Sequence, residues 1–289
     1  MKWVLGFACI AALAGCSSQH DGHSGAMTAH QHTTPDAKAG DAHAGHPAAM
    51  GDAHAGHNAA MGNARLMVQT KPGQPKAGEK TALTLMLHGD GGAMVKDFEV
   101  VHEQKLHLIV VRDGLDQFAH IHPAIAADGT MTVEYAFPTG GTYWLFADYK
   151  PAGKAAATAR AEVRVAGDAP TAPALTPNVP GRVEGDGLRA DVSVADAKAG
   201  SAARIGFTLK DANDKSITDL HPYMGAMGHL VVISADGKEY VHAHPVEEKA
   251  TGNTVAFDAH FGKPGVYKGW GQFQRAGKVH AVPFVVNVD

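Results

Sequence analysis

The sequence predicts an all-β protein: two tandem antiparallel β-sandwich domains that follow an N-terminal segment unable to form a core. Three observations lead to this prediction. Short apolar runs of strand length alternate with Gly, Asp and Pro turns. One half of the chain repeats the other, and the N-terminal stretch is almost free of large apolar side chains. At 289 residues, the chain is long enough for two ordinary domains and additional segments.

Residues 1–16 have the pattern of a lipoprotein signal peptide. Lys2 supplies a positive charge, and the apolar stretch that follows is too short to span a bilayer as a stable helix. "LAGC" at 13–16 then resembles the lipobox of bacterial lipoproteins. The resemblance implies that Cys16 is lipidated and anchors the protein to a membrane, and Ser17 indicates the outer membrane. The alternative is an ordinary secretory signal with a chance cysteine.

Cysteine usage restricts the chemistry of the domains. The chain has two cysteines, Cys9 and Cys16, and both lie in the predicted signal. The mature domains therefore have neither a thiol nor a disulfide, and a metal site in them must use His, Met or carboxylate ligands. A blue-copper electron-transfer centre, which needs a Cys thiolate, is excluded. The net charge is −4 with both signs interspersed, so no nucleic-acid-binding surface is expected.

Residues 17–64 form a His- and Met-rich segment that is predicted to be disordered, because it cannot bury enough apolar surface to offset its ordering entropy. An 11-residue unit at 40–50 recurs at 51–61. Each unit has two histidines three residues apart and then a methionine; these residues are His43, His46, Met50, His54, His57 and Met61. A flexible chain of this kind can wrap a metal ion, which we expect it to capture. The alternative is a solvated spacer.

The remaining chain divides into residues 65–166 and 182–289, joined by a linker at 167–181 that contains four prolines. The two parts align at a constant offset of 122, which matches "HIHP" at 120–123 with "HAHP" at 242–245. This is a tandem duplication. Copies of about 100 residues with short strands indicate β-sandwiches of immunoglobulin or cupredoxin shape, and the topology is left open.

In the second copy, "GHLVVISADGKEYVHAHP" predicts a β-hairpin. Asp236 and Gly237 are the preferred centre of a two-residue type I′ turn. This register pairs Val231 with the first histidine of "HAH", and side chains two residues apart share a face. Three histidines therefore lie on one face at the open end of the hairpin, within reach of one ion; they are His229, His242 and His244.

The first copy predicts the same arrangement from a different turn. "RDGLDQ" places Gly114 and Leu115 at the centre of a type II′ turn. The corresponding histidines are His107, His120 and His122. We interpret both groups as transition-metal sites. The alternative is that the histidines are structural and bond to main-chain carbonyls within the fold.

The residues before each hairpin indicate which metal is bound. "LHPYMGAMGH" places Met224 and Met227 just before His229. Thioether sulfur together with imidazole suits copper, particularly Cu(I). The first copy has His102 and Lys105 at the corresponding positions, so its site should be harder and prefer Cu(II) or Zn(II). Alternatively, the methionines only fill the loop.

The lipobox, the His/Met segment and the paired hairpins together resemble bacterial envelope lipoproteins with YtkA-like or cupredoxin-like β-sandwich domains, some of which handle copper. The resemblance covers residues 65–289. It implies an all-β fold and a location on the periplasmic side of the envelope. From the ligand residues we expect copper as the bound ion, with zinc as a second candidate, and envelope metal-transport proteins as partners. The chain departs from electron-transfer cupredoxins in lacking the cysteine.

The leading functional hypothesis is a non-catalytic, lipid-anchored protein that binds copper for buffering, resistance or delivery. A second hypothesis is an envelope adhesion or scaffold module with structural histidines. An enzyme has less support. Three histidines could activate a zinc-bound water, but no Glu or Asp recurs in both copies as a general base.

Overall fold

The computed structural model describes residues 62–246 and 252–289. All regular elements in these residues are β-strands, and the pairings between strands are antiparallel, which confirms the predicted all-β class. No helix in this described part is long and apolar enough to cross a bilayer. The predicted signal peptide, the lipidation site Cys16 and the His/Met units of the N-terminal segment lie outside the described residues.

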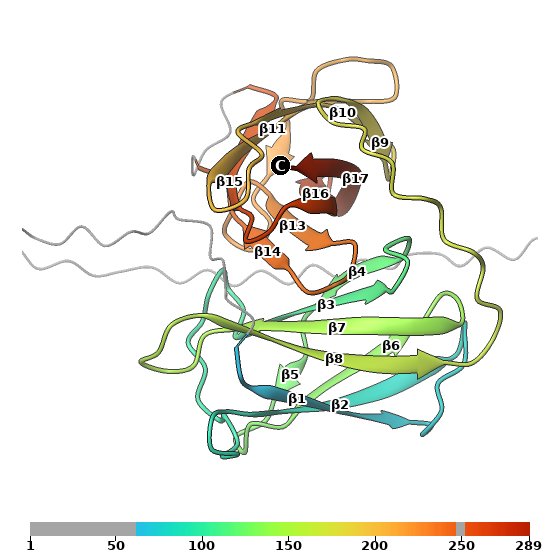
Figure 1. Cartoon of the computed structure of the whole chain (residues 1–289), viewed down its shortest axis with the longest axis vertical. Helices are drawn as coiled ribbons and strands as arrows, with labels where there is room; N and C mark the ends of the chain where they lie inside the picture. Colours follow the sequence, from blue (N-terminus) through green and yellow to red (C-terminus); the bar gives the residue numbers. More distant parts are fainter. Residues whose placement is uncertain (1–61, 247–251) are drawn as a thin grey trace, which may run out of the picture. The chain divides into compact units, whose positions relative to one another are not determined.

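The first repeat is a sandwich of two four-stranded sheets, ordered β1-β2-β6-β5 and β4-β3-β7-β8 (Figure 1). Its strands are β1 (Arg65–Lys71), β2 (Lys80–His88), β3 (Leu106–Arg112), β4 (Phe118–Ile121), β5 (Ala124–Ile125), β6 (Met131–Ala136), β7 (Gly141–Tyr149) and β8 (Ala157–Val165). In β2 every second side chain from Thr81 onward is buried, as expected for a strand with one face on a core.

The second repeat has sheets ordered β9-β10-β11-β15 and β12-β16-β13-β14, with β17 paired to β16. Its strands are β9 (Gly181–Gly185), β10 (Leu188–Ala195), β11 (Ala202–Lys210), β12 (Leu220–His221), β13 (His229–Ser234), β14 (Tyr240–Ala243), β15 (Thr254–His260), β16 (Gly265–Arg275) and β17 (Lys278–Val288). The order β4-β3-β7-β8 in the first repeat corresponds to β14-β13-β16-β17 here, so the duplication seen in the sequence is a duplication of topology.

Each sandwich has its own apolar core between its two sheets. The first core includes Leu83, Leu108 and Leu145, and the second includes Ile205, Leu230 and Phe257. Strand β3 does not alternate, because all seven of its residues are buried. One face of β3 packs in the core, and the other packs against the second repeat.

The contact between the repeats is a third apolar cluster, to which both sandwiches contribute. Its buried members are Ile109, Val111, Leu115, Trp144, Phe146, Val231, Ile233, Tyr240 and Trp270. Two aromatic pairs cross this contact. Phe118 stacks on Trp270 with ring centroids 4.5 Å apart, and Phe146 stacks on Tyr240 at 5.1 Å. The alignment of the copies matches Phe118 with Tyr240 and Phe146 with Trp270, so the two stacks are equivalent and the contact has approximate twofold symmetry.

The hairpin turns differ from the predicted types, although the predicted register is confirmed. Ile109 pairs with His120, and Val231 pairs with His242. The residue with positive φ is Leu115 in the first hairpin (55°) and Gly237 in the second (66°), and the first central residue of each predicted turn is not in the left-handed region. The predicted type II′ and type I′ turns were therefore wrong. Both loops instead place the left-handed residue at the same aligned position, and this keeps the register.

Gly237 is also where the first repeat packs against the second hairpin. A Cβ atom added there would lie 2.4 Å from the Trp144 ring. Gly237→Ala should therefore lower the free energy of unfolding by about 2–3 kcal/mol, of which about 1–2 kcal/mol is the left-handed backbone and the rest is overlap with the indole. Gly187→Ala is the matched control, because Gly187 also has positive φ (79°) but open space around it. Equal losses in urea unfolding of the two variants would show that the Trp144 contact contributes nothing.

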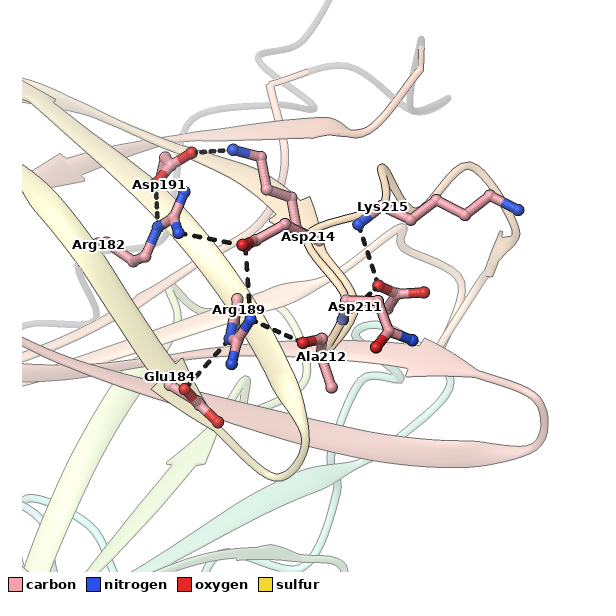
Figure 2. A network of polar contacts seen from close by, with 10 residues as sticks. Arg182, Glu184, Arg189, Asp191, Asp211, Ala212, Asp214 and Lys215 are labelled. Atoms are coloured by element: carbon pink, nitrogen blue, oxygen red, sulfur yellow. Dashed lines mark hydrogen bonds and ion pairs between the residues drawn. The ribbon is translucent and has the colours of Figure 1, made fainter.

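A network of charged side chains lies on the surface of the second repeat (Figure 2). Arg182 on β9 bonds to Asp191 on β10 and to Asp214 in the loop after β11, and Arg189 bonds to Glu184. Arg182 and Asp214 are about half exposed. Exposed ion pairs of this kind typically contribute about 0–1 kcal/mol each, so the network has little effect on stability.

Candidate metal centre

Six histidines lie at one end of the contact between the repeats. His107, Ile109 and Val111 alternate along β3 on the face that meets the second repeat, and His229, Val231 and Ile233 do the same on β13. The two histidines of each "H-x-H" motif, on or just after the next strand of the hairpin, complete two groups of three. Each group has one ligand atom per residue within 4.8 Å of the others: His107, His120 and His122 form the first, and His229, His242 and His244 form the second.

The nitrogen atoms within each group are at the spacing expected of ligands to one ion. His107 Nδ1 is 3.0 Å from His120 Nε2 and 3.3 Å from His122 Nε2. In the second group, His229 Nδ1 is 3.3 Å from His242 Nε2. Metal–nitrogen bonds of about 2.0–2.1 Å in tetrahedral geometry separate the ligating nitrogens by about 3.3–3.4 Å. The remaining ligand atoms of each group lie within 4.8 Å of the others, so each group can converge on a transition-metal ion.

The central strand histidines have their outer nitrogens fixed by main-chain carbonyls. His107 Nε2 donates to the carbonyl oxygen of Val101 at 3.1 Å, and His229 Nε2 donates to that of Tyr223 at 2.9 Å. Val101 and Tyr223 occupy aligned positions in the loops before β3 and β13. Because a carbonyl can only accept a hydrogen bond, each neutral ring carries its proton on Nε2, and Nδ1 presents a lone pair to its group.

The first histidine of each "H-x-H" motif is oriented by the other repeat. His242 Nδ1 donates to Asp148 Oδ2 at 2.7 Å, and His120 Nδ1 donates to Gln272 Oε1 at 3.1 Å. Asp148 lies on β7 opposite His107, and Gln272 lies on β16 opposite His229. The alignment of the copies also matches Asp148 with Gln272, so the two interactions are related by the twofold symmetry of the contact.

The inner ring nitrogens of each group face one another. His107 Nδ1 and His120 Nε2 are 3.0 Å apart, and His229 Nδ1 and His242 Nε2 are 3.3 Å apart. Nε2 of His244 and Nε2 of Gln272 are buried without a hydrogen-bond partner. Unpaired buried nitrogens are unfavourable in a closed site.

Burial lowers the pKa of five of the six rings and so favours the neutral form, which binds a metal. Desolvation lowers the pKa of His229 to about 3 and that of His122 to about 4. It also lowers the pKa of His107, His120 and His244, the last two with added repulsion from neighbouring histidines. These five rings are therefore neutral at neutral pH, and each can present a lone pair to an ion.

The two groups form one continuous cluster of rings. The ring centroids of His107 and His242 are 5.1 Å apart, and those of His120 and His242 are 5.5 Å apart. These distances across the contact match the distances within a group, such as 5.1 Å between His107 and His122. A small pocket borders the cluster and is lined by residues of both repeats, including Lys105, His107, Asp148 and His244.

One of the remaining predicted ligands, His102, lies beside the second group instead of the first. We expected His102 beside the first group, but its ring stacks on His244 of the second group at 3.4 Å and meets His229 edge-on at 5.9 Å. The loop carrying His102 meets its counterpart in the other repeat, and a Cβ on Gly225 would lie 3.6 Å from Glu103. Met224, the aligned counterpart of His102, is buried with a similar backbone (φ 49° for both), and Met227 is half-buried.

Sequence reasoning missed Asp148 and Gln272, and it treated the two groups as separate sites. The alignment that pairs "FADY" with "WGQF" already placed these two residues at one position, but an Asp matched with a Gln carries no ligand signal of its own. The other signal was the unbroken apolar run "LIVV" before Arg112, which indicates a strand buried on both faces.

A family model described as a domain of unknown function, DUF8832, matches the chain twice, over residues 60–167 and 182–289. No curated protein matches the chain. The two matched segments contain β1–β8 and all but the first residue of β9–β17.

Comparison with solved structures matches several bacterial proteins at low identity. FdeC, an adhesin of Escherichia coli, is 18% identical, with 78% of this chain and 64% of that chain covered and a TM-score of 0.25. InvD of Yersinia pseudotuberculosis is 14% identical, with 77% and 57% covered and a TM-score of 0.24. Invasin, a bacterial integrin-binding protein, is 11% identical, with 78% and 39% covered and a TM-score of 0.22. The chain spans less than two thirds of the length of each. These similarities are too low to indicate a function.

Proposed function

We propose that this chain, which belongs to the DUF8832 family through both of its sandwiches, binds copper ions through the two histidine groups at the contact between its repeats. The binding serves to buffer, resist or deliver the metal and does not involve catalysis on a substrate. The ligands are the two groups of three imidazoles, and the carbonyl, carboxamide and carboxylate oxygens around them hold the rings in place.

The convergence of the inner ring nitrogens carries this proposal. The proton of each strand histidine is committed to a carbonyl, and that of each partner histidine to Asp148 or Gln272. The inner nitrogens face one another at 3.0–3.3 Å, close to the spacing of ligands on one ion. Nε2 of His244 is buried in the same cluster without a hydrogen-bond partner, and an unmade buried hydrogen bond costs about 1–3 kcal/mol, which a bound ion would offset.

Copper is favoured over zinc by affinity and by the surrounding residues. Sites of nitrogen ligands bind Cu(II) more tightly than Zn(II), and imidazole suits both ions. A buried thioether, Met224, lies in the loop that leads into β13, and thioether sulfur favours Cu(I). Zinc is the second candidate ion.

The N-terminal segment has a place in the same proposal. A lipid on Cys16 would hold the protein on the periplasmic side of the envelope, which incorporation of a labelled fatty acid tests. The His/Met units at 40–61 would capture ions and pass them to the folded centre, and envelope metal-transport proteins would receive them. These residues precede the part of the chain that the structure describes.

A second candidate function is an envelope adhesion or scaffold module, in which the histidines hold the repeats together. The contact between the repeats favours this function, because each repeat supplies an oxygen that accepts a hydrogen bond from a histidine of the other repeat. In that case the contact between the sandwiches should form fully without metal, and copper should not change its stability.

Copper titration of the full chain distinguishes the two functions. The N-terminal histidines would bind copper themselves, so the chain should carry Gln in place of all eight histidines between His20 and His57. We expect this background protein to bind copper and to gain thermal stability, by about 4 kcal/mol when free copper is about a thousandfold above Kd. Zinc, added separately, should bind more weakly.

Each result of this titration supports one of the two functions and excludes the other, or changes the choice of metal. Copper binding with a stability gain supports the metal centre. If the background protein remains folded and binds neither copper nor zinc, the metal function is removed and the scaffold function is supported. Tighter binding of zinc than of copper would retain a metal centre and overturn the choice of metal.

A further inference from the structure

We infer that the six histidines form one dinuclear centre, in which the group oriented by Asp148 takes up the first ion and the group oriented by Gln272 takes up the second. This inference rests on the proposed metal function and adds to it the number of ions, their proximity and the order in which they bind. It follows from two features of the contact between the repeats.

The first feature is that rings of the two groups lie as close to each other as rings within one group. His242 of the second group lies 5.1 Å from His107 and 5.5 Å from His120, ring centre to ring centre, as close as neighbours within one group. His229 is 6.0 Å from His120 and 6.3 Å from His107. Two ions held by these rings would therefore be near neighbours inside one closed cluster. Neither group is complete in an isolated repeat, because each takes an orienting oxygen from the other.

The second feature is that the two symmetry-related positions carry side chains of different charge. At aligned positions, the first repeat supplies a carboxylate, Asp148, and the second supplies a neutral carboxamide, Gln272. Asp148 is almost completely buried, at 7% exposure, so its charge is poorly screened by water. A carboxylate bonded to the outer nitrogen of a ligating imidazole makes that ring more basic and strengthens its bond to the metal.

The groups should therefore fill in order. The group of His229, His242 and His244 has both the charge-assisted hydrogen bond, at 2.7 Å, and the unpaired Nε2 of His244. The group of His107, His120 and His122 has a neutral hydrogen bond at 3.1 Å in the equivalent place. Once the first ion is bound, its positive charge opposes entry of the second, and this increases the difference between the two affinities.

The test exchanges the two orienting residues in the full chain with its N-terminal histidines replaced as above. Asp148→Asn keeps an oxygen that can accept from His242 and removes the charge, so the affinity for the first ion should fall about 10–100-fold. Gln272→Glu should strengthen the other group and bring the two affinities together. In the double variant, Asp148→Asn with Gln272→Glu, the order of filling should reverse. Asp191→Asn, in the exposed network of Figure 2, is the matched control and should change neither affinity.

Two measurements are needed. NMR of the histidine rings during titration with Cu(I), which is diamagnetic, shows which group fills first. Electron paramagnetic resonance with Cu(II) shows whether two ions interact: the signal of isolated ions should grow with the first equivalent and fall with the second. Two full, independent copper signals, or binding of a single ion, would overturn the dinuclear centre while leaving copper binding intact. Filling of the His107 group first, or an equal effect of Asp148→Asn on both ions, would overturn the order. Absence of any copper binding would instead show that the proposed function itself is wrong.

Discussion

Replacing both strand histidines, His107→Gln together with His229→Gln, should abolish copper binding by the described part of the chain. Each residue provides the Nδ1 atom that faces the other ligands of its group. Gln can still donate a hydrogen bond to the carbonyl of Val101 or Tyr223, but its carboxamide is a poor ligand for copper. Loss of a direct ligand should exceed the roughly 10–100-fold effect of losing an outer-shell partner. Isothermal titration of the background protein without N-terminal histidines measures this.

The single variants and a distant control sharpen the test. His229→Gln alone should remove the tighter step and leave the weaker one, and His107→Gln should do the reverse. His280→Gln is the control, because His280 bonds to the carbonyl of Asp186 on another surface of the second repeat. Unchanged affinity in the double variant would show that neither strand histidine is a ligand.

Acidification should destabilise the metal-free protein in the range from about pH 6.5 downward. The pKa of His229 is lowered by burial from 6.5 to about 3, so between these values the unfolded chain binds a proton that the folded chain does not. Stability is therefore fully present above pH 6.5 and is lost as the pH falls. One such group gives a slope of about 1.4 kcal/mol per pH unit, and the other buried histidines with lowered pKa add to it. Urea unfolding followed by the fluorescence of Trp144 and Trp270, which lie at the contact, gives the slope.

A variant and added copper both test the loss of stability at low pH. In His229→Gln, the slope should decrease by the share of one proton, since that group no longer titrates. Saturating copper should move the destabilisation to lower pH, because a ring that binds the ion cannot take up a proton. A metal-free protein whose free energy of unfolding is constant between pH 7 and pH 5 would contradict the burial of neutral rings described above.

The sequence by itself determined the class of fold and the membership of each histidine group. Alternation and turn residues determine short antiparallel strands, and the duplication at an offset of 122 determines two copies. Pairing in a hairpin then brings His107 near His120 and His122, and His229 near His242 and His244, because contacts between neighbouring strands are local in the chain. The register was predicted correctly even though both turn types were wrong, because the predicted loop length is right and both loops place a left-handed residue at the same aligned position.

Only the tertiary structure decided how the two groups relate to each other. The Asp148–His242 and Gln272–His120 hydrogen bonds join residues 94 and 152 positions apart in the chain. The packing of one sandwich on the other depends on the shape of two sheet faces, which no local pattern specifies. The same packing places His102 on His244, against expectation, and brings the two histidine groups into one cluster of rings. The physical reason is that a strand pattern fixes which face a side chain occupies, whereas the partner of that face is chosen by side-chain packing across the whole contact.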